Sequence, residues 1–153
     1  MDYGYFPDPL ALVEVAVNKK LMKIFVREII YSLKLSEGEI ISSLGKAIGN
    51  KKNLIVADTN EPRTTAAIRK AGFNIVSAKK EKGSVKADII EIQDYQIIVD
   101  PKSENIKKEL RNYAWNNKKA SIPIGEYNHS LDAMRYAFRK QVKLKRRGVK
   151  RRN

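Results

Sequence analysis

The chain has 153 residues, of which 42% are hydrophobic and 31% are charged, and it contains no cysteine. This length suits one domain with its own core, and the composition is that of a globular rather than a disordered chain. The lack of cysteine excludes a disulfide framework, a thiolate zinc site and a cysteine nucleophile, and it favours an intracellular protein. No apolar run approaches the roughly 18–20 residues that span a bilayer, and no signal-peptide pattern opens the chain, so we expect no membrane partner.

The charge is strongly basic, with 31 Lys and Arg against 17 Asp and Glu and a net charge of +14. Residues 143–153, KLKRRGVKRRN, hold seven basic residues and no acid, and subtracting these seven leaves +7 for the rest. We therefore expect a folded domain over residues 1–142, a flexible basic tail over 143–153, and a polyanionic partner, with nucleic acid ahead of a membrane surface. The alternative is a solvated tail on a protein that binds no polyanion.

The first third of the chain predicts a hairpin and a helix. Two β-branched runs, residues 10–17 and 21–33, are joined at the polar residues 18–20, which favours two antiparallel strands. Ser36 and Glu39 form a capping-box pattern, and the apolar residues that follow recur at helical spacing up to a Gly-Asn pair.

The remainder alternates between strands and helices. A helix is expected to begin at Pro62 and to be closed by Gly72, because proline suits the first turn of a helix and glycine the position after its end. In chain order the other predicted elements are a strand at 54–57, a strand at 73–78, a charged loop and short helix within 79–93, a strand at 95–100, a helix at 103–115, a polar loop of about ten residues and a helix at 129–142. This order predicts an α/β fold with a mixed central sheet, an antiparallel hairpin plus parallel strands, flanked by helices.

Three aspartates are candidates for chemistry. Asp2 lies just ahead of the hairpin, and Asp58 directly follows an apolar strand, where α/β proteins place their active sites. Asp132 is expected to face inward on the last helix, and His129, three residues earlier, shares its helix face. Taken singly, Asp58 could be a turn or helix cap, Asp132 could pair with Arg135 or Arg139, and His129 could be a cap or a surface residue.

Three carboxylates brought together repel one another, so at least one should have a raised pKa, and a divalent cation is the simplest way to stabilise them. Oxygen-rich sites with few nitrogen ligands select hard cations such as Mg²⁺ or Mn²⁺.

The segments DYGYFPDPLALVEV, VADTNEP, KAGFNIVSAKK, IKKELRNYAW and NHSLDAMRYA resemble successive motifs of the nuclease domain of bacteriophage large terminase subunits, from Asp2 to about Gln141. The resemblance implies a ribonuclease-H-like fold and a two-metal DNA endonuclease that cuts concatemeric viral DNA during genome packaging. It also implies double-stranded DNA as substrate, the terminase ATPase domain, the small terminase subunit and the portal as partners, and the cytoplasm of the bacterial host as location.

By the same resemblance, Asp2, Asp58 and Asp132 hold two Mg²⁺ or Mn²⁺ ions, and His129 helps to shape the metal or scissile-phosphate site. Glu61 and Asp8 are weaker candidates. The residues expected to contact DNA phosphates are basic side chains of one loop and of the tail: Lys79, Lys80, Lys82, Lys145, Arg146, Arg147, Arg151 and Arg152. The three lysines are equally explicable as a solvated charge run.

The sequence departs from the family pattern in three ways. It holds no Walker A loop, so we expect the ATPase motor to be absent from this chain. Only Met1 precedes Asp2, so we expect a clipped first strand, as in an excised domain or a short reading frame. Asn128 stands where relatives often carry an acid.

Two other functions remain open at this point. One is a different ribonuclease-H-like nuclease, of the junction-resolvase type, with the same acids and a branched substrate. The other is a catalytically dead basic module that binds nucleic acid.

Overall fold

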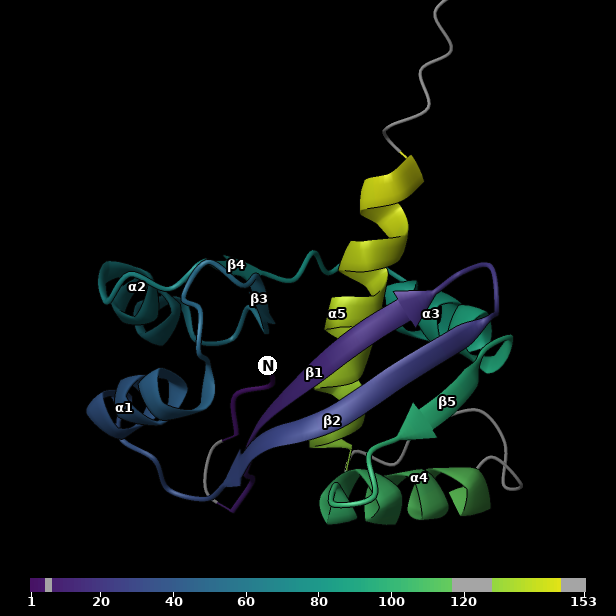
Figure 1. The fold of residues 1–153 in the computed structure, drawn as a ribbon, viewed down its shortest axis with the longest axis horizontal. Coiled ribbons are helices and arrows are strands. Elements are labelled where there is room, and N and C mark those ends of the chain that lie inside the picture. Colours follow the sequence, from purple (N-terminus) through teal and green to yellow (C-terminus); the bar gives the residue numbers. More distant parts are fainter. Residues whose placement is uncertain (5–6, 117–127, 147–153) are drawn as a thin grey trace, which may run out of the picture.

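The computed structural model describes residues 1–4, 7–116 and 128–146, and its ribbon is drawn in Figure 1. In chain order the elements are β1 (Leu10–Asn18), β2 (Lys23–Ser32), α1 (Glu37–Ala47), β3 (Ile55–Ala57), α2 (Pro62–Lys70), β4 (Ile75–Ser77), α3 (Ser84–Gln93), β5 (Gln96–Val99), α4 (Glu104–Asn116) and α5 (His129–Arg146). The predicted order of strands and helices is confirmed. Helix α5 continues to Arg146, so residues 143–146 of the predicted tail are helical.

The helix-capping structures that the sequence predicts are present. The backbone N–H of Ser36 donates to the Glu39 carboxylate at 2.8 Å, and the Glu39 N–H donates to the Ser36 hydroxyl at 3.4 Å, which closes the capping box of α1. Helix α2 begins at Pro62, and Gly72 follows its end with a φ of +93°, a left-handed conformation that glycine adopts without strain.

The hairpin of β1 and β2 is antiparallel and carries one irregularity. Leu12 is paired with Ile30 and Val13 with Glu28, so Ile29 is an extra residue on β2. Leu12 packs in one core and Val13 in the other, which lets both ends of β1 contribute to the interior.

The strands of the described residues form two hydrogen-bonded groups, β1-β2-β5 and β3-β4, in which β5 runs parallel to β2 and β4 parallel to β3. Met1 and Asp2 join these groups. Asp2 exchanges backbone hydrogen bonds of 2.8 and 3.0 Å with Ala11 of β1. On the other side the Met1 nitrogen donates to the Val56 carbonyl at 2.7 Å, and the Asp58 N–H donates to the Met1 carbonyl at 3.1 Å. The segment Met1-Asp2 is therefore held on both sides, and its pairing sets Asp2 beside Asp58.

Helices α3, α4 and α5 pack on one face of β1 and β2, and α1 and α2 pack beside β3 and β4 (Figure 1). One core joins β1, β3 and β4 to α1 and α2, around Leu44 and Ile68. The other joins β1 and β2 to α3, α4 and α5, around Ile24, Ile106 and Phe138. All five of these side chains are fully buried, so α5 is fixed against the sheet by close packing.

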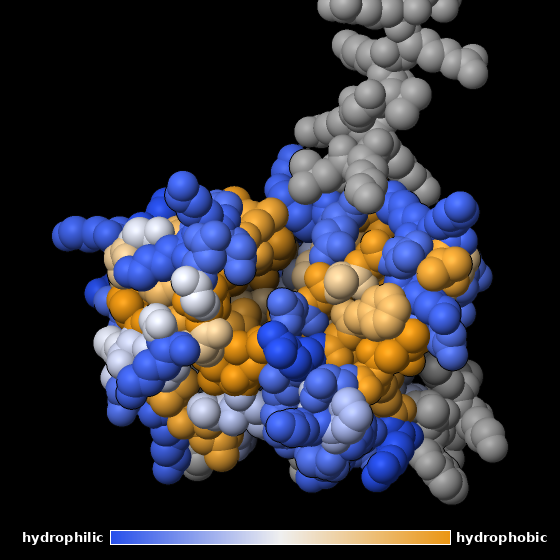
Figure 2. Space-filling view, viewed as in Figure 1, coloured by the Kyte–Doolittle hydropathy of each residue, from blue (hydrophilic) through white to orange (hydrophobic). Residues whose placement is uncertain are grey.

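A groove of about 730 Å³ lies between β1 and β3, with Val13 and Val15 on one side and Leu54 and Val56 on the other. Figure 2 shows the hollow from the direction of Figure 1, with apolar surface on both of its sides. Farther along β1, the side chain of Gln141 accepts from the Val17 N–H at 3.2 Å and donates to the Val15 carbonyl at 2.8 Å. The Gln141 amide thus occupies the edge of β1 that Met1 and Asp2 leave free.

No helix in the described ranges has both the length and the apolar character needed to cross a membrane.

Candidate metal centre

Asp2 and His129 form the first part of the site. Asp2 is only 7% exposed, and its Oδ2 lies 3.0 Å from Nδ1 of His129, the first residue of α5. The other ring nitrogen, Nε2, lies 3.5 Å from Oδ1 of Asp8. The hydrogen bond with Asp2 raises the pKa of His129, burial opposes this shift, and the charges of Asp2 and Asp8 add to it. The imidazole thus orients the Asp2 carboxylate, and the Asp8 carboxylate contacts the opposite side of the same ring.

Asp58 follows the last residue of β3 and is 3% exposed. Its Oδ1 accepts a hydrogen bond from the Thr59 N–H at 2.6 Å and lies 2.5 Å from Nζ of Lys80. The N-cap residue of α2 is Glu61, without a side-chain cap. Asp58 is therefore not the N-cap of α2, and its charge is compensated by a lysine from the loop between β4 and α3.

Asp132 lies in the first turn of α5. Its Oδ1 accepts from Arg135 at 3.0 Å (Nη2) and 3.3 Å (Nε), and Nδ2 of Asn128 lies 3.5 Å from its other oxygen. Burial raises the pKa of Asp132, the charges of Asp2 and Asp58 raise it further, and Arg135 acts in the opposite direction. The expectation of a raised pKa among the three acids is thus confirmed at Asp132, with burial as the main cause and repulsion as a lesser one.

Arg135 and Arg139 belong to a chain of buried ion pairs that links α5 to α3. Asp88 of α3 accepts two hydrogen bonds of 3.1 Å from Arg139 and lies 3.8 Å from Nη1 of Arg135. Arg139 also donates to Glu81 at 2.8 Å. Of the two arginines considered as partners of Asp132, Arg135 is the one that contacts it.

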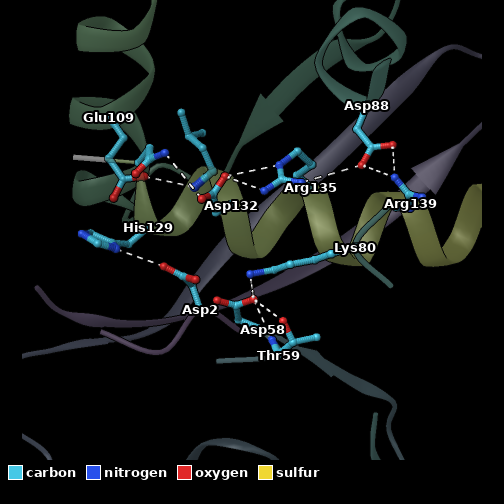
Figure 3. Close-up of polar contacts among 12 residues, drawn as sticks. Asp2, Asp58, Thr59, Lys80, Asp88, Glu109, His129, Asp132, Arg135 and Arg139 are labelled. Atoms are coloured by element: carbon cyan, nitrogen blue, oxygen red, sulfur yellow. Dashed lines mark hydrogen bonds and ion pairs between the residues drawn. The ribbon is translucent and has the colours of Figure 1, made fainter. Parts of the chain in front are cut away.

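The three aspartates come from the segment before β1, the end of β3 and the start of α5, and their carboxylates face a common space (Figure 3). Within the described residues, however, no group of three or more His, Asp or Glu side chains is close enough to hold a metal ion. Each carboxylate instead has a basic partner, namely His129, Lys80 or Arg135. The donor set is nevertheless of the kind that Mg²⁺ and Mn²⁺ prefer, and two of its three carboxylates are buried, where a counter-charge is required. The chemistry of these side chains thus suits a hard divalent cation, whereas their placement in this structure does not gather three of them around one point.

Glu109 is a functional candidate that sequence reasoning did not single out. It is 2% exposed on α4, and its carboxylate accepts from the backbone N–H groups of Ser130 at 3.2 Å and Leu131 at 3.0 Å. Burial raises its pKa, and these two amides act in the opposite direction. Glu109 thus caps the first turn of α5, which carries His129. The one available signal was its spacing, since it follows Ile106 by three residues and so lies on the helix face that is predicted to be apolar.

The predicted phosphate-binding residues lie in different surroundings. Lys80 contacts Asp58, whereas Lys79 and Lys82 are exposed beside it. The tail candidates lie outside the described side chains: Lys145, Arg146, Arg147, Arg151 and Arg152.

The chain is similar to known proteins over most of its length. Residues 2–140 match the family model of the terminase RNase H-like domain. The large terminase subunit of Bacillus phage SPP1 is 33% identical over 94% of this chain and 36% of its own length. The PBSX phage terminase large subunit of Bacillus subtilis (strain 168) is 26% identical over 90% of this chain and 33% of its own length. The chain thus spans about a third of the length of these curated relatives.

A solved structure extends the likeness to the fold. The crystal structure of the large terminase nuclease domain from bacteriophage SPP1 with bound Mn superimposes with a TM-score of 0.78, at 32% identity, over 92% of this chain and 83% of that one. The ribonuclease-H-like fold expected from the sequence is confirmed. The chain therefore belongs to the terminase RNase H-like domain family and shares its fold with the nuclease domain of the SPP1 large terminase.

Proposed function

We propose that this domain is a metal-dependent DNA endonuclease that cuts concatemeric viral DNA during genome packaging. The observation that carries the proposal is the common space faced by Asp2, Asp58 and Asp132, which come from three separate elements (Figure 3). The Mn bound in the SPP1 nuclease domain supports a divalent cation as the cofactor.

In this proposal Asp2, Asp58 and Asp132 hold two Mg²⁺ or Mn²⁺ ions. When bound, such a pair supplies an activated water and stabilises the leaving oxygen of the phosphodiester. The protein's part is positioning. Asp2 and Asp58 are set side by side through the backbone of Met1, and His129 fixes the Asp2 carboxylate by a 3.0 Å contact.

The substrate is double-stranded DNA, and the basic charge of the chain supports contact with its backbone rather than with its bases. The two relatives are whole large terminase subunits. We therefore extend the proposal to the ATPase domain, the small terminase subunit and the portal as partners, in the cytoplasm of the bacterial host.

The test is cleavage of a supercoiled plasmid by the purified chain with Mg²⁺, with Mn²⁺ and with EDTA. Asp58→Asn should lose metal-dependent cleavage, because a lost ligand lets the cations leave their positions. The matched control is Asp94→Asn, which makes the same change at an exposed aspartate just after α3.

Three outcomes separate the possible functions. The proposal is supported if the wild type and Asp94→Asn cut linear duplex DNA and Asp58→Asn does not. Cleavage restricted to a four-way junction would assign the domain to the junction-resolvase type instead. DNA binding without cleavage in either metal would leave a catalytically dead binding module.

A further inference from the structure

Lys80 is the least constrained of the basic side chains that compensate the three carboxylates. Its side chain is 46% exposed, whereas those of His129 and Arg135 are 12% and 9% exposed. Arg135 also lies near the buried carboxylate of Asp88. Lys80 lies instead 3.3 Å from the neutral side-chain oxygen of Asn60. Lysine is a strongly hydrated ammonium on a flexible stem, so it can leave its partner at a smaller cost than a buried arginine.

The position of Lys80 follows from the pairing of β3 with β4. Ala57 is in register with Ser77, and the Ala78 N–H donates to the Ala57 carbonyl at 2.7 Å. The residues after β4 therefore run beside those after β3, and Lys80 reaches Asp58 from this loop. In Figure 3 its ammonium enters the space between Asp58 and α5.

We propose that Lys80 is an exchangeable counter-cation: it neutralises Asp58 until a divalent metal displaces it, and its freed ammonium then binds a phosphate of the DNA next to the metal. The inference rests on the proposed role of Asp58 as a metal ligand. Since one cation replaces another at Asp58, the buried carboxylate is never left without a counter-charge. The displaced ammonium stays close to the metal, where a DNA phosphate brings negative charge.

The exchange predicts that Lys80→Gln raises the affinity for Mn²⁺ and lowers the affinity for DNA. Without DNA, Lys80 competes with the metal, so Lys80→Gln should bind Mn²⁺ about two- to fivefold more tightly, as expected for loss of a partly exposed ion pair. With DNA and metal together, Lys80→Gln should bind duplex more weakly, because a phosphate contact is missing. A purely structural role would weaken both.

The experiment measures Mn²⁺ affinity by isothermal titration calorimetry, and duplex affinity in EDTA and in Ca²⁺ by fluorescence anisotropy. The control is Lys86→Gln, which removes the same charge from an exposed lysine of α3. We expect only Lys80→Gln to tighten Mn²⁺ binding and to lose part of the gain in DNA affinity that Ca²⁺ gives the wild type. A thermal melt of both variants checks that they are folded.

The outcomes distinguish this inference from the proposed function. Equal or weaker Mn²⁺ binding by Lys80→Gln, with normal binding by the wild type, would overturn the exchange and leave the metal site in place. Equal effects of Lys86→Gln and Lys80→Gln would overturn the exchange, because Lys80 would then act only as part of the general basic surface. If neither the wild type nor Lys80→Gln binds Mn²⁺, both the metal site and the exchange are wrong.

Discussion

At the scale of single residues, the three proposed metal ligands are each compensated by a different basic side chain. Asp2 is bound to an imidazole, Asp58 to a half-exposed ammonium and Asp132 to a buried guanidinium. This division allows three acids to face one space without a metal, because each has its own counter-charge. It also means that metal entry requires side chains to rearrange.

The raised pKa of Asp132 gives the first prediction. Its folded pKa lies above the ordinary value of 3.8, so its contribution to stability is present below that pH and is lost as pH rises through the raised value. At neutral pH the ionised form is therefore a cost in the metal-free protein. Asp132→Asn should change the free energy of unfolding by no more than about 1 kcal/mol, in the stabilising direction if at all. The same change should reduce Mn²⁺-dependent plasmid nicking by about a hundredfold or more.

Urea unfolding in EDTA and a nicking assay in Mn²⁺ test this prediction together. A variant that is strongly destabilised without metal but still nicks DNA would make Asp132 a structural partner of Arg135.

The His129–Asp2 contact gives a pH prediction. The pKa of His129 is raised above 6.5, chiefly by its hydrogen bond with Asp2. The stabilisation from this pair is therefore full below pH 6.5 and is lost as pH rises through the raised pKa. The free energy of unfolding of the metal-free wild type should fall across this window relative to that of His129→Asn. Parallel stability curves for the two proteins from pH 6 to pH 9 would contradict the prediction.

At the scale of elements, the position of α5 depends on a cap supplied by another helix. Glu109 of α4 accepts the N–H groups of Ser130 and Leu131. Glu109→Leu removes both acceptors from buried amides, so we expect a loss of about 2–6 kcal/mol of stability, from about 1–3 kcal/mol for each of the two unsatisfied groups. Glu109→Gln retains one acceptor oxygen and should cost less. Urea unfolding of the two variants measures the difference, and equal losses would show that hydrogen bonding at this position is not the cause.

Most elements could be predicted because their signals are local. The capping box at Ser36, the Pro62 start and the Gly72 end each act within a few residues, and all three form. The division of the strands into β1-β2-β5 and β3-β4 could not be predicted. Periodicity shows which side chains are buried but not which strand edges pair.

The sequence could name candidate site residues but not the contacts that they make. The positions of Asp2, Asp58 and Asp132 follow from element ends and from the family resemblance. The ion pair of Lys80 with Asp58 depends on the register of β3 with β4, and the role of Glu109 depends on how α4 packs on α5. Both are long-range consequences of packing, which no spacing in the sequence encodes.

At the scale of the whole molecule, the net charge of +14 is expected to drive contact with DNA, and the end of the chain gives a prediction. Arg147, Arg151 and Arg152 follow α5, so replacing them with Gln leaves the described helix intact. Each phosphate contact that is lost should flatten the slope of log K against log salt concentration by about 0.9. Sequence preference should not change, because backbone contacts carry no base information. Fluorescence anisotropy of a duplex over a salt series measures the slope. An unchanged slope would mean that these residues do not touch DNA.

The central claim, that Asp2, Asp58 and Asp132 together hold the catalytic metal ions, is tested most directly by anomalous diffraction from crystals grown with Mn²⁺. We predict two anomalous peaks roughly 3.5–4 Å apart among the three carboxylates, with the Lys80 ammonium moved away from Asp58. Mn²⁺ bound elsewhere, or no peak in this space with Lys80 still on Asp58, would contradict the account.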